Sequence, residues 1–404
     1  MSQTSRHAMA VLAPGLIAYS MGQTVLFALA GPAFREMGLR ETQLGIIISA
    51  AAVVFVFSSA VWGRISDRWG RRPTIVFGLT TYGLISLAFA GVMHLGLNAS
   101  LAVTTTFISL LLLRLLYAAL GAGIQPASVA LMADLSDEQG RSSAIAGVGA
   151  AFGIGMVLGP ASAALLVSFG LLTPLYAIAV FGLITALVAW FYLPSVPRRA
   201  DDSTEVTPLD RSTLIPLIAA GLAFYIAMSV VQQTFAFNLQ DVLQLDSTEA
   251  ARLTGFCFMT IAVGTLGVQG GVIQVLKPTP STLLLVGFPL VLASLLIYAT
   301  ATSFIQLIAS AAVMGCGFGL VTPGLLAAAS LLSDEQQQGK VAGLMQATMS
   351  AGYVIGPVTG TAVYELQRLY APGVAVVSAI LAGLFVGVWY YQYRRANPAQ
   401  TASP

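Results

Sequence analysis

The stretch GRISDRWGRRP, from Gly63 to Pro73, contains five charged residues in eleven, although only 8% of the 404-residue chain is charged. A soluble domain has about a quarter of its residues charged, and this chain is 57% hydrophobic. Most of its surface must therefore face lipid rather than water. The charged stretch marks a point at which the chain leaves the lipid.

Apolar runs on both sides of this stretch are long enough to cross a membrane. A run of about 20 residues spans a hydrocarbon core of about 30 Å, and lipid leaves its backbone groups to bond within a helix. The sequence predicts twelve such helical runs: 9–34, 43–62, 74–95, 101–134, 142–168, 171–194, 214–239, 251–276, 281–301, 304–332, 340–366 and 371–392. No separate soluble domain is expected.

The distribution of Lys and Arg predicts the orientation. If the N-terminus is inside, roughly thirteen of the eighteen Lys and Arg residues lie on the cytoplasmic side, as the positive-inside rule requires. Both termini are therefore expected to be cytoplasmic in a multi-pass protein of the cell membrane. The short tails and loops favour a prokaryotic cytoplasmic membrane.

A polar segment divides the chain in the middle. PSVPRRADDSTEVTPLDRS, from Pro194 to Ser212, has no apolar period and is predicted to be a cytoplasmic linker. The predicted domains are an N-terminal six-helix bundle at 1–194, a linker at 195–213, and a C-terminal six-helix bundle with a short cytoplasmic tail at 214–404.

The two halves also resemble each other in sequence. PASVALMADLSDEQGR at 126–141 resembles PGLLAAASLLSDEQQQGK at 323–340, and GIGMVLGPASAA at 153–164 resembles SAGYVIGPVTGTA at 350–362. Internal repeats are common in transporters. The expected fold is an all-α integral membrane protein with twelve transmembrane helices in two pseudo-symmetric six-helix bundles.

With these features, the chain resembles the major facilitator superfamily, and within it the twelve-span drug:proton antiporter branch. The signature G-x-x-x-D-R-x-G-R-R is matched by Gly63, Asp67, Arg68, Gly70, Arg71 and Arg72. The two glycines are expected to permit a sharp turn between the runs 43–62 and 74–95.

The resemblance implies a conformational switch at this signature. In relatives, the acid and the arginines form a charge cluster with an acid at the cytoplasmic end of the fourth span and with the start of the eleventh. The cluster latches the halves in the outward-facing state. The matching acid here is Asp134. The alternative is a solvated loop cluster in which the arginines only anchor the topology.

Arg114 is the charge that the sequence predicts deep in the membrane. An arginine there costs about 2.5 kcal/mol or more, so it should face the bundle interior or a wet cavity. Arg114, Tyr117, Gly121 and Gln125 share one helical face by their spacing. The stripe resembles the family pattern R-x-x-q-G, whose arginine is assigned to proton coupling or substrate charge, although Tyr117 and Ala118 replace the usual residues. A structural arginine bonded to carbonyl groups is the alternative.

Polar residues in the predicted helices are candidates for a substrate cavity. They are Tyr19, Gln23, Tyr117, Gln125, Tyr225, Gln232, Gln233 and Gln346. Amides can hydrogen-bond a substrate without charge, but they can equally hold helices together. Spans 1, 4, 7 and 10 line the cavity in the superfamily that the chain resembles, which favours Gln23, Gln125 and Gln232.

A glycine–proline pattern occurs in both halves. It resembles the antiporter signature G-x-x-x-G-P, although Ala163 and Ala164 stand where that signature has paired glycines. Small residues allow helices to approach closely and proline bends a helix, so we expect a packing and hinge role. The residues are Gly155, Gly159 and Pro160 in the first half, and Gly352, Gly356 and Pro357 in the second.

These patterns predict a secondary active transporter. The leading interpretation is proton-coupled efflux of small amphipathic compounds, of the multidrug type, by alternating access. All sixteen Asp and Glu residues are predicted in loops or at helix ends. A cavity with Arg114 and no acid should accept neutral or anionic solutes better than cations. The alternative is a carrier for a specific metabolite such as a sugar, organic acid or siderophore, possibly a symporter or facilitator.

The sequence argues against other classes of function. A membrane enzyme needs convergent catalytic groups, but no acid, His or Cys cluster occurs in the predicted helices, nor does the nucleotide-binding pattern G-x-x-x-x-G-K-[ST]. Cys257 and Cys316 are predicted to be packing residues. We expect no enzymatic activity, cofactor, metal site or nucleic-acid partner; the expected partners are a small-molecule substrate, protons as the coupling ion, and the lipid bilayer.

Overall fold

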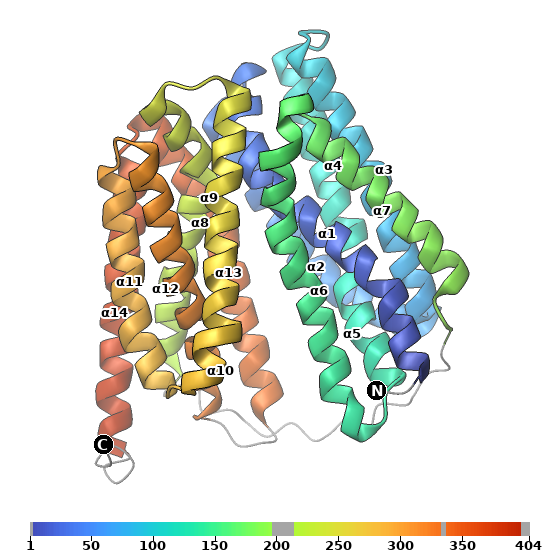
Figure 1. Ribbon diagram of the computed structural model, residues 1–404, viewed down its shortest axis with the longest axis vertical. Coiled ribbons are helices and arrows are strands. Elements are labelled where there is room, and N and C mark those ends of the chain that lie inside the picture. Colours follow the sequence, from blue (N-terminus) through green and yellow to red (C-terminus); the bar gives the residue numbers. More distant parts are fainter. Residues whose placement is uncertain (1–2, 196–213, 333–336, 397–404) are drawn as a thin grey trace. The chain divides into compact units, whose positions relative to one another are not determined.

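The computed structural model describes residues 3–195, 214–332 and 337–396, and within them every element of regular structure is helical (Figure 1). The helices of the first half are α1 Gln3–Glu36, α2 Glu41–Trp69, α3 Arg71–Leu97, α4 Val103–Gly121, α5 Ile124–Asp134, α6 Glu138–Leu166 with the 3-10 turn Val167–Phe169, and α7 Thr173–Tyr192. Residues 196–213 of the predicted linker and 333–336 of the second SDEQ copy lie outside the described residues.

The second half is also helical in the described residues. Its helices are α8 Ile215–Leu243, α9 Ser247–Gly267, the π-helical segment Val268–Val272, α10 Ile273–Leu276, α11 Pro280–Thr300, α12 Phe304–Ser330, α13 Gln338–Leu366 and α14 Tyr370–Ala396. In the described chain, eleven helical segments are long and apolar enough to cross a membrane. The 29-residue α13 is the twelfth long segment, so the predicted all-α membrane fold is confirmed.

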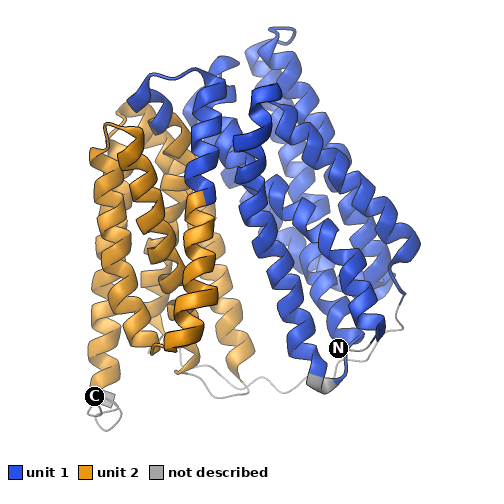
Figure 2. Ribbon diagram, in the orientation of Figure 1, with its two compact units in different colours: residues 1–202, 239–259 blue, residues 203–238, 260–404 orange. Residues whose placement is uncertain are grey.

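The helices form two compact units (Figure 2). Unit 1 comprises residues 1–202 and 239–259, and unit 2 comprises residues 203–238 and 260–404. The C-terminal end of α8 and the first part of α9 therefore pack in unit 1, together with the helices of the first half.

The turn between α2 and α3 corrects one prediction. Gly63 lies inside α2, which continues seven residues past its predicted end to Trp69. The polar residues after Gly63 continue the helix, because nothing in them interrupts its hydrogen bonds. The chain turns at Gly70 alone, where φ is +105°, a backbone conformation that favours glycine. Gly70 is therefore the glycine that the turn requires.

Two predicted helices are interrupted. The run 101–134 divides into α4 and α5, because Pro126 lacks a backbone N–H and its ring is incompatible with a regular helix through the carbonyl of Ala122. The indole Nε1 of Trp62 donates to the carbonyl of Ala119 near the end of α4, at 2.6 Å. The run 251–276 contains the π-helical turn with Gly270 and Gly271 between α9 and α10.

Glycines bring α6 against α1 in unit 1. A Cβ atom on Gly155 would lie 2.5 Å from the carbonyl oxygen of Ile17. One on Gly159 would lie 2.8 Å from the carbonyl oxygen of Met21 and would also meet the hydroxyl of Thr24. Only glycine permits this approach. Pro160 follows directly within the continuous helix α6.

The second glycine–proline copy makes an equivalent contact in unit 2, where α13 packs on α8. A Cβ atom on Gly352 would lie 2.5 Å from Cβ of Tyr225, and one on Gly356 would lie 2.6 Å from Cβ of Ser229. Pro357 follows within α13. The two copies therefore bring the corresponding pairs of helices together, α6 with α1 and α13 with α8. Their hinge role stays a prediction.

The substitution Gly159→Ala tests this packing. We expect it to lower the free energy of unfolding by about 1–3 kcal/mol, because the added methyl group meets backbone that cannot move aside. The measurement is the thermal midpoint of the purified protein in detergent, with size-exclusion chromatography to follow the folded fraction.

Gly149→Ala is the matched control, because Gly149 lies on the same helix and a Cβ atom added to it would have no neighbour within 4 Å. Alanine is favoured over glycine in a helix by about 1 kcal/mol, so this variant should be as stable as the original protein or more so. Equal effects of the two substitutions would contradict the packing argument.

Candidate functional site

A charge cluster lies at the turn between α2 and α3. The guanidinium of Arg71 contacts the carboxylate of Asp67 at 2.6 Å and the carboxylate of Asp134 at 3.3 Å. It also donates to the hydroxyl of Ser66 at 3.2 Å. Because Arg71 begins α3 and Asp134 ends α5, one cation joins α2, α3 and α5. The structure thus brings together the three residues that the sequence proposed as a switch.

The remaining arginines of the signature lie apart from this cluster. Arg72 donates to the hydroxyl of Ser195 at 3.3 Å and to the carbonyl of Trp190, and so joins α3 to the end of α7. Arg68 is exposed. In the signature, Arg71 therefore lies between carboxylates, Arg72 bonds to the end of α7, and Arg68 lies at the surface.

Arg114 lies on α4 and reaches α1. Its Nη2 donates to Oε1 of Gln23 at 3.0 Å, and its guanidinium carbon lies 4.5 Å from the ring centroid of Tyr117. The amide of Gln23 donates in turn to the hydroxyl of Tyr19, at 3.4 Å. Arg114 therefore has a carbonyl partner and a ring partner, and within the described residues no carboxylate forms an ion pair with it.

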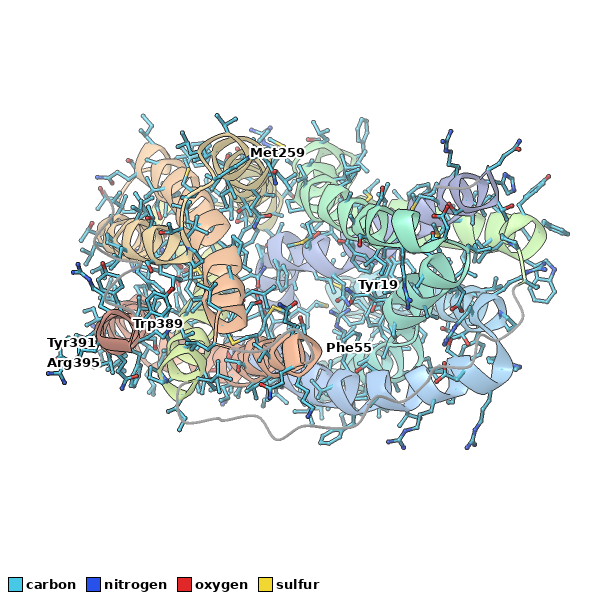
Figure 3. The ribbon with its side chains drawn as sticks, turned by 90° about the horizontal axis from the view of Figure 1, so that it is seen from below. Tyr19, Phe55, Met259, Trp389, Tyr391 and Arg395 are labelled. Carbon is cyan, nitrogen blue, oxygen red and sulfur yellow. The ribbon has the colours of Figure 1, made fainter. Side chains whose placement is uncertain are left out.

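Aromatic rings cluster around Tyr19, next to this arginine, in unit 1. The ring of Tyr19 is stacked on that of Tyr117 at 6.1 Å between centroids, and meets Tyr82 edge-on at 5.5 Å and Phe152 edge-on at 6.0 Å. The hydroxyl of Tyr82 donates to the carbonyl of Ala18 at 2.7 Å. Tyr19 lies among the helices of unit 1 (Figure 3). Such rings attract a cation through their faces.

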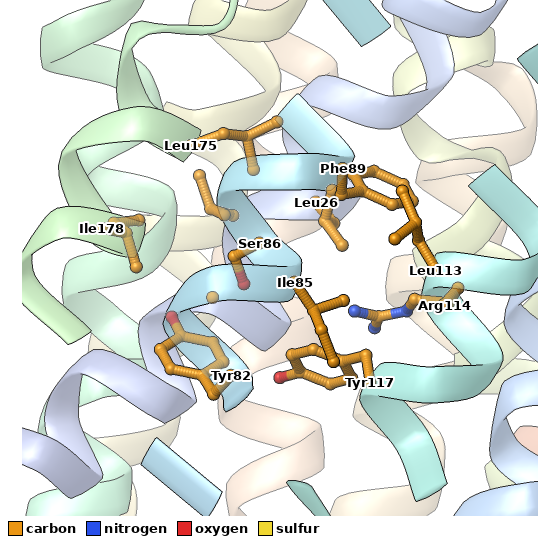
Figure 4. A pocket seen from close by; sticks show the side chains of 12 residues that line it. Leu26, Tyr82, Ile85, Ser86, Phe89, Leu113, Arg114, Tyr117, Leu175 and Ile178 are labelled. Atoms are coloured by element: carbon orange, nitrogen blue, oxygen red, sulfur yellow. The ribbon is translucent and has the colours of Figure 1, made fainter. Parts of the chain in front are cut away.

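A small cavity adjoins Arg114 (Figure 4). Its volume is about 20 Å³, and its walls come from α1, α3, α4 and α7. The polar side chains in the walls are those of Tyr82, Ser86, Arg114 and Tyr117. Nε of Arg114 and the hydroxyl of Tyr117 are buried without a hydrogen-bond partner in the described structure.

Sequence reasoning did not single out Tyr82 and Ser86 of α3, which line this cavity, and it expected Gln125 on the same helix as Arg114. The only signal for Tyr82 and Ser86 was the polar character of the stretch TTYGLIS at 80–86, which does not indicate the residues that these side chains contact. Gln125 was expected on one continuous face with Arg114. The break after Gly121 instead puts Gln125 on α5, where it is exposed, while Tyr117 and Gly121 are buried.

The other candidate cavity residues belong to unit 2. Tyr225 is buried, with its ring centroid 5.1 Å from that of Phe224 and 6.3 Å from that of Tyr353. Gln233 is buried, Gln232 is half-buried and Gln346 is exposed. In unit 2, Tyr225 therefore belongs to an aromatic cluster, and the three glutamines differ in their exposure.

An ion-pair network that the sequence did not predict lies at the C-terminal end of α1. Arg35 forms two contacts with the carboxylate of Asp241, at 2.5 and 3.0 Å, and two with that of Glu41, at 2.7 and 2.8 Å. The hydroxyl of Ser247 donates to the carbonyl of Pro32 at 3.3 Å. These contacts, all in unit 1, join α1 to α2, α8 and the start of α9.

The fold agrees with a comparison against known families. A family model described as Major Facilitator Superfamily matches residues 12–302 and 279–404, which together cover most of the chain. The chain belongs to the major facilitator superfamily. The family predicted from the sequence is thereby confirmed. As a member of this superfamily, the protein is a multi-pass membrane transporter and not an enzyme.

Several known proteins are similar to this chain. "Multidrug resistance protein 2" of Bacillus subtilis is 27% identical over 363 residues, which cover 84% of each chain. "Tetracycline resistance protein, class B" of Escherichia coli is 25% identical over 338 residues, which cover 80% of this chain and 79% of that protein. Among solved structures, a bacterial homologue of the human lysosomal transporter Spinster has a TM-score of 0.73 at 15% identity, covering 98% of each chain.

The substitution Arg71→Gln tests the charge cluster. It leaves two carboxylates close together without their cation, so we expect a loss of transport of tenfold or more at unchanged expression, which corresponds to about 1.4 kcal/mol or more. Arg64→Gln removes the same charge from an exposed position of α2 and should change transport little. The measurement is initial transport rate per folded transporter; equal losses in both variants would contradict a specific role for Arg71.

Proposed function

We propose that the protein exports small amphipathic compounds in exchange for protons, by alternating access. The similar multidrug and tetracycline resistance proteins support efflux as the direction, because the similarity extends over about four-fifths of the chain. In the structure, the proposal rests on Arg114 and the tyrosines near it. They place one cation and several aromatic faces between α1, α3 and α4.

Arg114 also supports a preference among substrates. Its guanidinium has no carboxylate partner in the described residues, and the groups that contact it are the neutral Gln23 and Tyr117. A positive site in a low-dielectric bundle attracts anions and repels cations. We therefore propose that the transporter favours neutral or anionic amphipathic solutes, with aromatic side chains providing adaptable apolar contacts.

The cluster of Asp67, Arg71 and Asp134 is proposed as the conformational switch. One arginine holds two carboxylates from different helices, so a relative movement of these helices must break at least one contact. Asp134 is the less exposed of the two acids, with 18% of its side chain accessible against 46% for Asp67. Asp134 is therefore our candidate for the proton-carrying acid.

The proposed location is the cell membrane, with both termini in the cytoplasm. At the C-terminal end of α14, Arg394 and Arg395 lie over the rings of Tyr390 and Tyr391, with guanidinium carbons 5.5 and 4.8 Å from the ring centroids. Figure 3 shows Tyr391 and Arg395 pointing away from the rest of unit 2. Aromatic and basic residues together suit the interface between lipid and cytoplasm.

Accumulation of a panel of solutes tests the proposal. Cells that lack their major exporters and express the transporter should accumulate less of the neutral and anionic compounds, and a protonophore should restore accumulation. Arg114→Ala should lower export of anionic compounds by tenfold or more and affect neutral ones less, because it removes the attracting charge. Asp67→Asn should lower export of every class.

The other outcomes discriminate between functions. Strong export of cations that Arg114→Ala leaves unchanged would contradict the proposed preference. Export that the protonophore does not affect would contradict proton coupling. Saturable transport of a single sugar, organic acid or siderophore, without export of the panel, would favour the metabolite carrier.

A further inference from the structure

A groove lies on the surface of unit 1 between α3 and α7, which run side by side (Figure 1). Its volume is about 570 Å³, within the range of roughly 300–1,000 Å³ that is typical of small-ligand sites. The walls come from the end of α2, the first part of α3 and the last part of α7, and they are almost entirely apolar. Leu187 and Trp190 in these walls are each 60% exposed, so the groove opens toward the surrounding lipid.

Contacts between α3 and α7 limit the groove at both ends. At one end the two helices approach closely, because a Cβ atom on Gly83 would lie 3.1 Å from the carbonyl oxygen of Ala179. At the other end the guanidinium of Arg72 donates to the carbonyl of Trp190 and to the hydroxyl of Ser195, the latter at 3.3 Å. The groove is therefore apolar along its length and has a cation at one end.

The length of the groove fits one leaflet of a bilayer. The residues of α3 that line it extend from Pro73 to Thr80, and seven residues of helix rise about 10.5 Å. The hydrocarbon core of a bilayer is about 30 Å thick, so each leaflet contributes about 15 Å. An occupant that follows the groove is thus a long apolar chain with a polar group at the end near Arg72.

The polar end of the groove has an excess of positive charge. The turn between α2 and α3 carries four arginines, and the two carboxylates in its charge cluster, those of Asp67 and Asp134, both pair with Arg71. Arg68 is exposed, and within the described residues no carboxylate forms an ion pair with it or with Arg72. A guanidinium has five N–H donors, and two neutral oxygens take only part of this capacity in Arg72. Phosphate oxygens suit the other donors.

Two tryptophans mark the depth of this end. Trp69 and Trp190 line the groove and are 52% and 60% exposed, and the ring of Trp69 meets that of Phe77 edge-on at 5.7 Å between centroids. Tryptophan is enriched where hydrocarbon meets the headgroups, because its ring is apolar and its N–H is a donor. The arginines therefore lie at the level of the lipid headgroups.

We propose that this groove binds an anionic phospholipid of the bilayer, with one acyl chain between α3 and α7 and the phosphate on Arg68 and Arg72. A zwitterionic lipid would fill the apolar walls equally well but would leave the excess positive charge, whereas basic residues at the membrane surface attract anionic lipids. In the orientation proposed above, the lipid belongs to the cytoplasmic leaflet. The inference does not depend on export, because lipid binding is measured without transport.

Native mass spectrometry of the purified full-length protein tests the charge preference. The probes are phosphatidylglycerol and phosphatidylcholine with identical acyl chains, and phosphatidylglycerol should bind tenfold or more tightly than phosphatidylcholine. The double variant Arg68→Gln with Arg72→Gln should lower phosphatidylglycerol binding tenfold or more and leave phosphatidylcholine binding unchanged. As a control, Arg40→Gln with Arg252→Gln removes the same charge from the other end of α2 and from α9, and should retain the preference.

A second pair of variants tests the groove without changing its charge, and remains informative if the double arginine variant fails to fold. Leu187→Trp fills the groove and should lower phosphatidylglycerol binding tenfold or more. Ile184→Trp is the matched control, because Ile184 lies on the same helix, is 54% exposed and does not line the groove. This variant should bind phosphatidylglycerol as the original protein does.

Two outcomes would overturn the inference. One is equal binding of the two lipids by the original protein. The other is phosphatidylglycerol binding that is as tight in Leu187→Trp, or in the double arginine variant, as in the original protein. Export is measured separately, so its absence contradicts the proposed function and leaves the lipid site in place.

Discussion

A positive charge inside an apolar helix bundle must be satisfied by the bundle itself, and Arg114 imposes this constraint on unit 1. Inserting an arginine at the centre of a membrane helix costs about 2.5–3.5 kcal/mol. Its hydrogen bond to Gln23 contributes about 1.5–3 kcal/mol, and the contact with the ring of Tyr117 about 0.5–2 kcal/mol. These contacts offset the insertion cost, but they require α1 and α4 to keep a fixed relative position.

The position of α1 depends in turn on close packing. On one side, Gly155 and Gly159 bring α6 against it; on another, Gly22 leaves space for the hydroxyl of Tyr82 on α3. These contacts hold Tyr19 and Gln23 where they can reach Tyr117 and Arg114. The glycines that look like a packing pattern in the sequence therefore contribute to the geometry of a polar site.

Much of the fold could be predicted from the sequence, because lipid imposes a length and a composition on every spanning helix. The predicted runs agree with the helices to within a few residues at most ends, and Gly70 is the turn residue. Gly63 was misjudged, since a glycine can stand inside a helix when the residues around it continue the hydrogen bonding. The helix breaks after Gly121 because of Pro126. The run 101–134 is long and largely apolar, so its length alone predicted one continuous helix.

Side-chain partners were harder to predict. Helical periodicity gives the face on which Arg114 lies, but not that Gln23, 91 residues earlier, is its partner. The same holds for Arg35 and Asp241, which are 206 residues apart. The cluster of Asp67, Arg71 and Asp134, which joins residues far apart in the sequence, was named in advance because a family signature supplied what periodicity does not.

The most direct test of the account is the charge preference of the variant Gln23→Glu. It puts a carboxylate 3.0 Å from Arg114, at the position of the present amide oxygen, and so neutralises the charge that we hold responsible for selectivity. The ratio of cation to anion export should rise by about tenfold or more relative to the original protein, and Gln23→Met should leave it near its original value. An unchanged ratio in a folded, active Gln23→Glu transporter would contradict the central role of Arg114.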